Sequence, residues 1–303
     1  MKHLLSLRDL SADEIRNLLE RALEMKAHPG RYSGALRGKA LAMIFEKPSL
    51  RTRVSFDVGI HQLGGYSVNL TPVEINLGKR ESVRDVARNL GRMVQGIMVR
   101  TFAHSIAEEM ALHAGVPVIN GLTDFSHPCQ GLADYMTVLE VKGGLKGVKV
   151  AYVGDGNNVA HSLIYGGASL GVHFTIATPA GYEPNPQVVE WGRAKAKETG
   201  GRVEVLRDAA AAVRAADVVY TDVWASMGQE SEAAERRRIF APYRVDEALF
   251  GEAAPDAVFM HCLPAHRGEE VTDAVIDSPR SVVYQQAENR VHGQKAVMLE
   301  LMG

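Results

Sequence analysis

The alternation of short apolar runs with amphipathic segments most constrains the fold of this chain. In the first half, we expect strands at 41–45, 66–70, 96–99 and 116–119, and helices at 11–27, 51–63, 82–93, 105–114 and 132–141. The second half repeats the pattern, with strands at 149–153, 173–177, 202–205, 218–221, 257–260 and 282–284, and helices at 159–170, 187–198 and 208–215. Strands that alternate with helices pair in parallel, so the sequence predicts an α/β fold.

A pair of glycines, Gly143 and Gly144, ends the last helix of the first half, and we place a domain boundary there. A chain of 303 residues is long enough for two domains of about 150 residues each. We therefore predict two doubly wound α/β domains, 1–142 and 143–289, each a parallel sheet flanked by helices. The closing helical segment, 290–303, is expected to pack back onto the first domain.

Composition and charge exclude several classes of function. The formal net charge is −2, whereas nucleic acids and anionic membranes need an extended basic field on their partner. The chain has no apolar run of about 18 residues, and Ser11 followed by Glu14 is typical of a helix start, so we expect a cytoplasmic protein. Two cysteines, Cys129 and Cys262, are too few for a disulfide framework or a zinc site. We expect no metal and no cofactor.

The stretch from Glu46 to Phe56 turns from a buried strand into a helix and carries Ser49, Arg51 and Thr52 at the turn. A helix N-terminus has unpaired N–H groups and a partial positive charge, to which these residues add hydroxyls and a guanidinium. That combination suits a phosphate. Read alone, the motif could equally be an ordinary capped helix with solvated arginines.

Other polar residues also follow predicted strands, where ligands bind in doubly wound sheets. Arg100 ends the third predicted strand, and His127 and Gln130 open the helix after the fourth. Each taken singly would be read as a surface arginine or a satisfied core residue. Together with Arg51 and Thr52 they would supply the cations and donors that an acyl phosphate requires.

The segment from Gly154 to Asn158 approximates a glycine-rich dinucleotide fingerprint, so a dehydrogenase has to be considered. That function needs an acidic residue about 20 positions further on, and the first acid here is Glu183, beyond a proline. We interpret Asn157 and Asn158 instead as amide groups that point at a substrate.

Two further loops follow strands in the second half. Asp222 would suit the ammonium of an amino-acid headgroup, and the hydroxyl and backbone N–H groups of the loop Ser226, Met227 and Gly228 would suit its carboxylate, although the loop alone could be a plain turn. Cys262 lies between imidazoles and could be a buried hydrophobe or a proton acceptor. The charge-dense run 230–238 is read as a solvated helix face.

Six motifs resemble, in order and spacing, those of the ornithine carbamoyltransferases in the aspartate/ornithine carbamoyltransferase family. They are SLRTR at 49–53, HPCQ at 127–130, GDGNN at 154–158, DVWASMG at 222–228, HCLPAHRGEEV at 261–271 and AENR at 287–290. Six ordered motifs across nearly the whole chain are far more specific than one. Three positions depart from the family pattern. The family usually has a threonine where this chain has Leu50, a glutamine or histidine where it has Asn76, and a basic residue where it has Ala265.

The resemblance implies a carbamoyl-phosphate domain followed by an ornithine domain, closing over the substrates, in a homotrimer or trimer-based assembly. It implies carbamoyl-phosphate contacts from Ser49, Leu50, Arg51, Thr52, Asn76, Arg100, His127, Gln130, Cys262, Leu263 and Arg290. It implies ornithine contacts from Asn158, Asp222, Ser226 and Met227. It makes Cys262, Arg100, His127 and Arg51 the catalytic residues.

The expected reaction is attack of the ornithine δ-amino group on carbamoyl phosphate, giving citrulline and phosphate, a step of arginine metabolism. Cys262 and Asp222 are the candidates to take the proton from the amine. The alternatives are a carbamoyltransferase for putrescine, an acylated ornithine or aspartate, and a non-catalytic nucleotide- or amino-acid-binding α/β protein. An aspartate substrate would call for cations where this sequence has Asp222.

Overall fold

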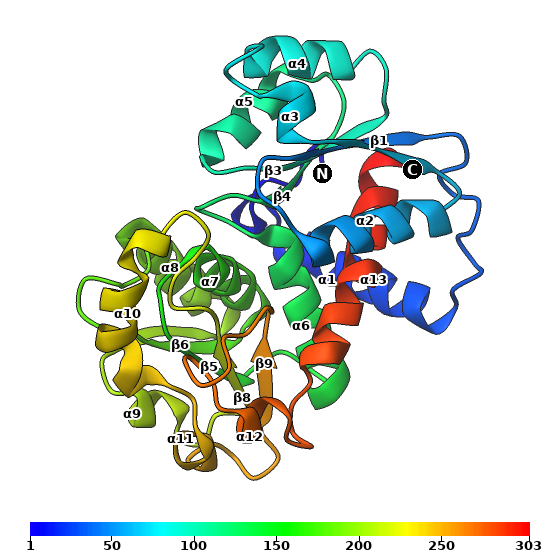
Figure 1. Ribbon diagram of the computed structural model, residues 1–303. Coiled ribbons are helices and arrows are strands. Elements are labelled where there is room, and N and C mark those ends of the chain that lie inside the picture. The colour runs from blue at the N-terminus through cyan, green and yellow to red at the C-terminus, as the bar shows by residue number, and fades with distance from the viewer. The chain divides into compact units, whose positions relative to one another are not determined.

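The computed structural model describes residues 1–303 apart from the side chain of Glu230. The chain divides into two compact units, the first made of Met1–Met136 with Glu288–Gly303 and the second of Thr137–Ala287 (Figure 1). Two helices, α6 (Pro128–Lys142) and α13 (Val283–Met302), run from one unit into the other. Each unit contains one parallel sheet flanked by helices, as the sequence predicts.

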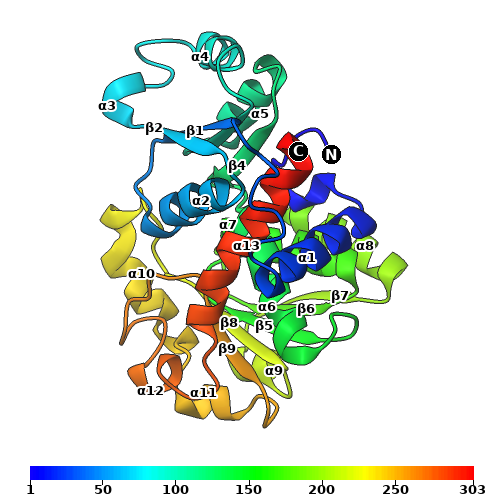
Figure 2. The ribbon, with the colours of Figure 1, turned by 90° about the vertical axis from the view of Figure 1, so that its right-hand side faces the viewer.

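The sheet of the first unit has four parallel strands in the order β2-β1-β3-β4. These strands are β1 (Ala40–Phe45), β2 (Tyr66–Leu70), β3 (Gly96–Arg100) and β4 (Val118–Leu122). The helices that belong wholly to this unit are α1 (Ala12–Ala27), α2 (Leu50–Gln62), α3 (Pro72–Ile75), α4 (Val83–Leu90) and α5 (His104–His113). In both ribbon views the C-terminal part of α13 lies beside α1, where Arg21 pairs with Glu300 (Figure 2).

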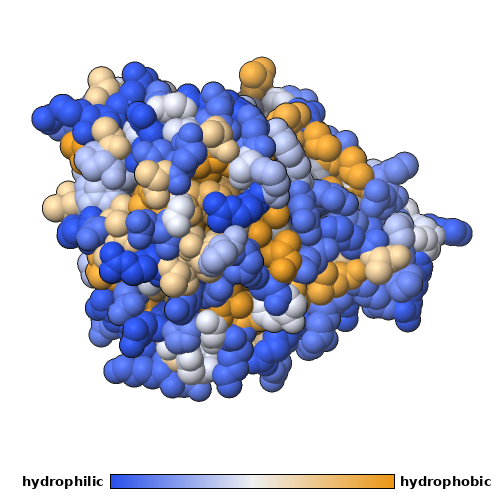
Figure 3. Space-filling model, turned by 90° about the horizontal axis from the view of Figure 1, so that it is seen from below, coloured by the Kyte–Doolittle hydropathy of each residue, from blue (hydrophilic) through white to orange (hydrophobic). Residues whose placement is uncertain are grey.

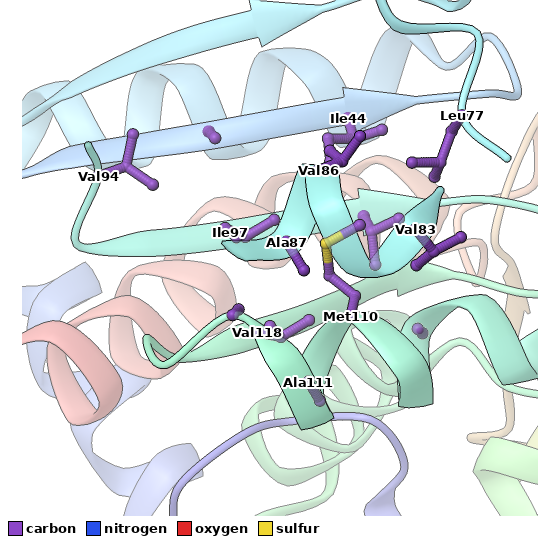
Figure 4. Close-up of a cluster of buried hydrophobic side chains, with 14 of the residues drawn as sticks. Ile44, Leu77, Val83, Val86, Ala87, Val94, Ile97, Met110, Ala111 and Val118 are labelled. Atoms are coloured by element: carbon purple, nitrogen blue, oxygen red, sulfur yellow. The ribbon is translucent and has the colours of Figure 1, made fainter. Parts of the chain in front are cut away.

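The core of the first unit explains why β1 reads as one unbroken apolar run. Every residue of β1 is buried, because helices cover the sheet on its two faces. On one face, side chains of α4 and α5, such as Val86 and Met110, point toward Ile44, Ile97 and Val118 of the strands (Figure 4). Burial of such side chains contributes roughly 1.5–3 kcal/mol each and fixes the sheet that carries the polar loops.

The sheet of the second unit has five parallel strands in the order β7-β6-β5-β8-β9. The strands are β5 (Lys149–Val153), β6 (His173–Ala177), β7 (Arg202–Leu206), β8 (Val218–Thr221) and β9 (Val258–His261). Its helices are α7 (Asn158–Leu170), α8 (Pro186–Thr199), α9 (Ala209–Val213), α10 (Ala233–Phe240), α11 (Glu247–Gly251) and α12 (Asp273–Ile276). Val213, Phe250 and Val275 pack from the helices against Phe259 of the sheet.

One predicted strand, 282–284, is wrong. Val282 makes one hydrogen bond of the kind found between strands, since its N–H donates to the Phe259 carbonyl at 3.0 Å. The helix α13 begins at the next residue. The apolar triplet therefore reads as a strand although it only enters a helix. The fourth strand is also displaced, since it runs from Val118 to Leu122 and not from 116 to 119. The strand was predicted to end at 119 because Asn120 and Gly121 interrupt the apolar run.

Among the described residues, no helix combines the length and the apolar character that crossing a bilayer requires. The face in Figure 3 mixes hydrophilic side chains with hydrophobic areas that do not cover it. Large apolar residues are exposed on α2 and β2.

Candidate active site

The strand order of each sheet fixes where the polar loops gather. In the first sheet the chain leaves β1 toward β2 on one side and returns to β3 on the other, so the order reverses between β1 and β3. In the second sheet the same reversal lies between β5 and β8. Ligands in doubly wound sheets bind beyond the carboxyl ends of the strands at these reversals. The predicted loops follow these four strands, at 46–52, 100–101, 154–158 and 222–228.

Thr52 is the centre of the polar cluster in the first unit. Ser49 caps α2 by accepting the Thr52 N–H at 3.1 Å, which holds Thr52 in the first turn of the helix. The Thr52 hydroxyl, fully buried, accepts a hydrogen bond from Arg290 Nη2 at 2.7 Å and one from Arg100 Nη1 at 3.4 Å. Two guanidiniums that are far apart in the sequence thus converge at one helix N-terminus.

His127 lies within the electrostatic reach of three arginines in this unit. Its ring is buried, and burial followed by the charges of Arg290, Arg100 and Arg51 lowers its pKa well below the ordinary value. The imidazole is therefore neutral at neutral pH, so it can donate a hydrogen bond without adding a further charge. The site therefore concentrates positive charge, which suits an anionic ligand.

Gln130 lies in the first turn of α6 and is almost completely buried, at 1% exposure. Its Nε2 donates to Asp134 Oδ1 at 2.8 Å. Within the described part of the chain, its Oε1 has no hydrogen-bond partner. A buried amide oxygen without a donor is costly, so this atom is suited to receive an N–H from a ligand.

Two predicted residues of the first unit lie on its exterior. Leu50 is 73% exposed at the start of α2, which leaves its backbone N–H as the group that could serve a phosphate. Asn76 is exposed in the left-handed conformation that ends α3, with φ 47°. No described hydrogen bond or ion pair joins the Asn76 side chain to Thr52 or the arginines.

The polar cluster of the second unit is centred on Asp222, which is buried. The Cys262 thiol donates to Asp222 Oδ1 at 3.0 Å, and Asn157 Nδ2 donates to Oδ2 at 2.8 Å. The Val223 N–H donates to Oδ1 as well. These three hydrogen bonds hold the Asp222 carboxylate beside the Cys262 thiol.

The expectation that the Asn157 amide points at a substrate is wrong. Its Oδ1 caps α7 by accepting the N–H groups of Val159 and Ala160, and its Nδ2 is committed to Asp222. The residue therefore positions the carboxylate. Asn158, the first residue of α7, is half-buried, as are Cys262 and Ser226, while Met227 is 41% exposed.

His261 supports the backbone next to Cys262. The Leu263 N–H donates to His261 Nδ1 at 2.8 Å, so Nδ1 carries no proton, and Nε2–H donates to the buried Glu270 Oε1 at 3.2 Å. This pair holds Leu263 at φ +59°, a conformation that non-glycine residues rarely adopt. His261 therefore fixes the loop that presents Cys262 and Leu263.

Two family models match the chain almost end to end. Residues 2–140 match the carbamoyl-P binding domain of aspartate/ornithine carbamoyltransferase, and residues 146–301 match its Asp/Orn binding domain. The chain belongs to the aspartate/ornithine carbamoyltransferase family.

Individual members of this family are similar over their full length. The ornithine carbamoyltransferase of Thermococcus kodakarensis is 57% identical over all of this chain and 96% of that protein, and the anabolic enzyme of Pyrococcus furiosus gives the same values. The solved Pyrococcus furiosus structure has a TM-score of 0.97, with 56% identity, and covers 100% of this chain and 97% of its own. An acetylornithine transcarbamylase complexed with acetylcitrulline has a TM-score of 0.90, with 33% identity, and covers 100% of both chains.

Sequence reasoning missed an ion pair beside the DVWASMG loop of this carbamoyltransferase family member. Arg236 lies in the run read as a solvated face, yet it is buried, with Nη1 3.1 Å from Asp155 Oδ2 and 2.9 Å from the Trp224 carbonyl oxygen. Burial raises the pKa of Asp155 to about 6, and Arg236 offsets part of that shift. Glu232, four residues earlier, pairs with Arg236 and was the available signal.

Two groups of side chains in this family member have ligand atoms close enough together to hold a metal ion. Asp222, His261 and Cys262 have ligand atoms within 4.8 Å of one another, as do His266, Glu269 and Glu270. Both nitrogens of His261 and both oxygens of Asp222 already have protein partners, as described above. Burial raises the pKa of the Cys129 thiol to about 12.

Proposed function

We propose that the first unit binds carbamoyl phosphate and the second binds ornithine, and that the chain transfers the carbamoyl group to the δ-amino nitrogen. The products are citrulline and phosphate, in arginine metabolism. The observation that carries the proposal is the convergence of Arg100 and Arg290 on the Thr52 hydroxyl, beside Arg51 and neutral His127. This cluster supplies what a phosphate with an attached carbonyl needs.

In this proposal the phosphate lies at the N-terminus of α2. Backbone N–H groups from Ser49 to Thr52 and the guanidinium of Arg51 bind its oxygens. Arg100 and His127 donate to the carbonyl oxygen, where negative charge develops when the amine attacks, and Arg290 stabilises the leaving phosphate. Donors arranged in advance for that charge contribute about 10²-fold each to the rate.

The second unit binds the amino acid in this proposal. Asp222 accepts from an ammonium, while Asn158, Ser226 and the backbone of Met227 receive the carboxylate. The δ-amine resembles lysine, with a pKa near 10.4, and has to lose a proton before it attacks. The Cys262 thiol and the Asp222 carboxylate, 3.0 Å apart, are placed to relay that proton. Leu263, held by His261, contacts the carbamoyl group.

The test compares amines under one condition. The purified enzyme is given carbamoyl phosphate with ornithine, acetylornithine, putrescine or aspartate, and the carbamoylated product and free phosphate are measured. We expect turnover with ornithine at least about 100-fold above the others, because hydrogen-bonding sites reject analogues that leave polar groups unpaired. No product with ornithine would refute the proposal, and preference for acetylornithine would favour the second candidate that the solved relative represents.

We also propose that the chain forms a homotrimer, or an assembly of trimers, in the cytoplasm. Apolar residues are exposed on α2 and on the edge strand β2, namely Leu50, Val54, Val58, Tyr66 and Val68. A face of this kind is typical of a subunit interface. Asn76, also exposed, would then reach carbamoyl phosphate in a neighbouring subunit. Light scattering tests this, since Val54→Glu should yield smaller species if the face is an interface.

We also propose the limits of the two domains. We assign carbamoyl phosphate to 1–142 and ornithine to 143–289, with 290–303 belonging to the first domain through Arg290 and α13. The pairing of Arg290 with Thr52 supports that assignment.

A further inference from the structure

We propose that Asp134 is a specificity-determining residue: it fixes the orientation of the Gln130 amide so that the site accepts an acyl phosphate with an N–H group and rejects one with a methyl group. The inference rests on the proposed function, because it assumes that carbamoyl phosphate binds in the first unit. It concerns a residue that sequence reasoning did not single out.

The two side chains are paired within one helix. Gln130 and Asp134 are four residues apart on α6, so both lie on the same side of the helix. Each is only 1% exposed, and Gln130 Nε2 lies 2.8 Å from Asp134 Oδ1.

The chemistry of the pair fixes which end of the Gln130 amide faces the ligand. An ionised carboxylate only accepts hydrogen bonds, so the amide group that faces Asp134 has to be the NH₂. The Oε1 is then turned away from Asp134, and it has no hydrogen-bond partner within the described residues. If the amide rotated, its oxygen would face the carboxylate oxygen, which is electrostatically unfavourable.

An oxygen fixed in this way selects among acyl phosphates. The NH₂ of carbamoyl phosphate donates to Oε1, whereas the methyl group of acetyl phosphate has the same size but leaves the buried oxygen unpaired. The same oxygen also turns the carbamoyl plane, so that the carbonyl oxygen points toward its donors. Without Asp134, both orientations of the Gln130 amide would become accessible. A Gln130 NH₂ that faced the ligand would not distinguish the NH₂ of carbamoyl phosphate from the methyl group of acetyl phosphate.

The experiment measures the ratio of two affinities. Inhibition by acetyl phosphate against carbamoyl phosphate is compared in the parent enzyme and in Asp134→Asn, whose amide can either donate or accept. We expect the parent to prefer carbamoyl phosphate by about 10- to 100-fold and Asp134→Asn to lose most of that preference. A purely structural role would weaken both ligands equally and leave the ratio unchanged, which would overturn the proposal.

Two further variants sharpen the result. Gln130→Glu combined with Asp134→Asn exchanges donor and acceptor, so an oxygen is again directed at the ligand, and the ratio should return toward the parental value even if both affinities fall. Glu140→Gln is the matched control, because Glu140 lies on the same helix and accepts from Gln285 Nε2 at 3.1 Å. It should leave the ratio unchanged. If the parent fails to bind carbamoyl phosphate at all, the proposed function fails; if it binds but the ratio survives Asp134→Asn, only this inference fails.

Discussion

The two polar clusters are built on the same topology but have opposite electrostatic character. In the first unit, burial and then the charges of Arg290, Arg100 and Arg51 lower the pKa of His127, and the three guanidiniums suit an anion. In the second unit, Asp222 holds a thiol and an amide, and burial together with Asp222 raises the pKa of Asp155. The comparison shows that a doubly wound sheet fixes where a site forms, whereas the loop residues decide what it binds.

The largest expected effect tests the cationic cluster. Arg51→Ala should lower kcat/KM for carbamoyl phosphate by about 10³-fold, because a guanidinium that contacts transition-state charge is lost. Steady-state kinetics with ornithine at saturation measures it. Arg53→Gln, an exposed residue of the same helix, is the control and should stay within about twofold. Equal activities of Arg51→Ala and the parent would contradict the contrast between the sites.

The second prediction tests the anionic cluster. Asp222→Asn should lower kcat/KM for ornithine by about 10²-fold and leave carbamoyl-phosphate binding nearly unchanged, because the amide can no longer accept as a carboxylate from an ammonium and the Cys262 thiol. Calorimetric titration and steady-state kinetics separate the two effects. Asp256→Asn, an exposed residue paired with Lys142, should change neither. Equal losses toward both substrates would show that the clusters are not functionally distinct.

The third prediction concerns stability against pH. Asp155 has a pKa of about 6 when folded and 3.8 as an ordinary value, so between these pH values the folded state binds more protons than the unfolded state. The free energy of unfolding should therefore fall as pH rises from 3.8 to 6, by up to about 3 kcal/mol from this group. Urea denaturation at several pH values measures this. Asp155→Asn should remove that slope, and an unchanged slope would contradict the assignment.

The smallest expected effects are changes in the free energy of unfolding when one buried glutamine from each unit is replaced. Gln294 on α13 is fully buried, and neither atom of its amide has a partner within the described structure. Gln294→Leu should therefore raise the free energy of unfolding by about 1 kcal/mol without changing turnover.

Gln286 is the matched control from the second unit. It is equally buried, but it accepts from the His261 N–H and donates to the Tyr220 hydroxyl. Gln286→Leu should lower the free energy of unfolding by about 1–3 kcal/mol. Thermal melts measure both variants, and a loss of stability in Gln294→Leu would show that its amide has a role.

Several parts of the fold were predictable because local sequence and tertiary context agree. Strands such as 66–70 and 149–153 were predicted with their observed limits, and the Ser11–Glu14 capping box starts α1 as expected. The triplet 282–284 failed because three apolar residues do not distinguish a strand from the entry of a buried helix. Only the tertiary structure shows that the N–H of Val282 donates to the carbonyl of Phe259 on β9.

The sequence by itself determined the alternating α/β pattern, the family and the residue types of both clusters, since these follow from periodicity and from motifs that are local in the chain. Only the tertiary structure decided that Arg290 meets Thr52, that Asn157 supports Asp222, that Arg236 is buried on Asp155 and that Asp134 orients Gln130. The physical reason is that hydrogen bonds and desolvation depend on which groups become neighbours in space. Three of these four pairs join residues that are distant along the chain.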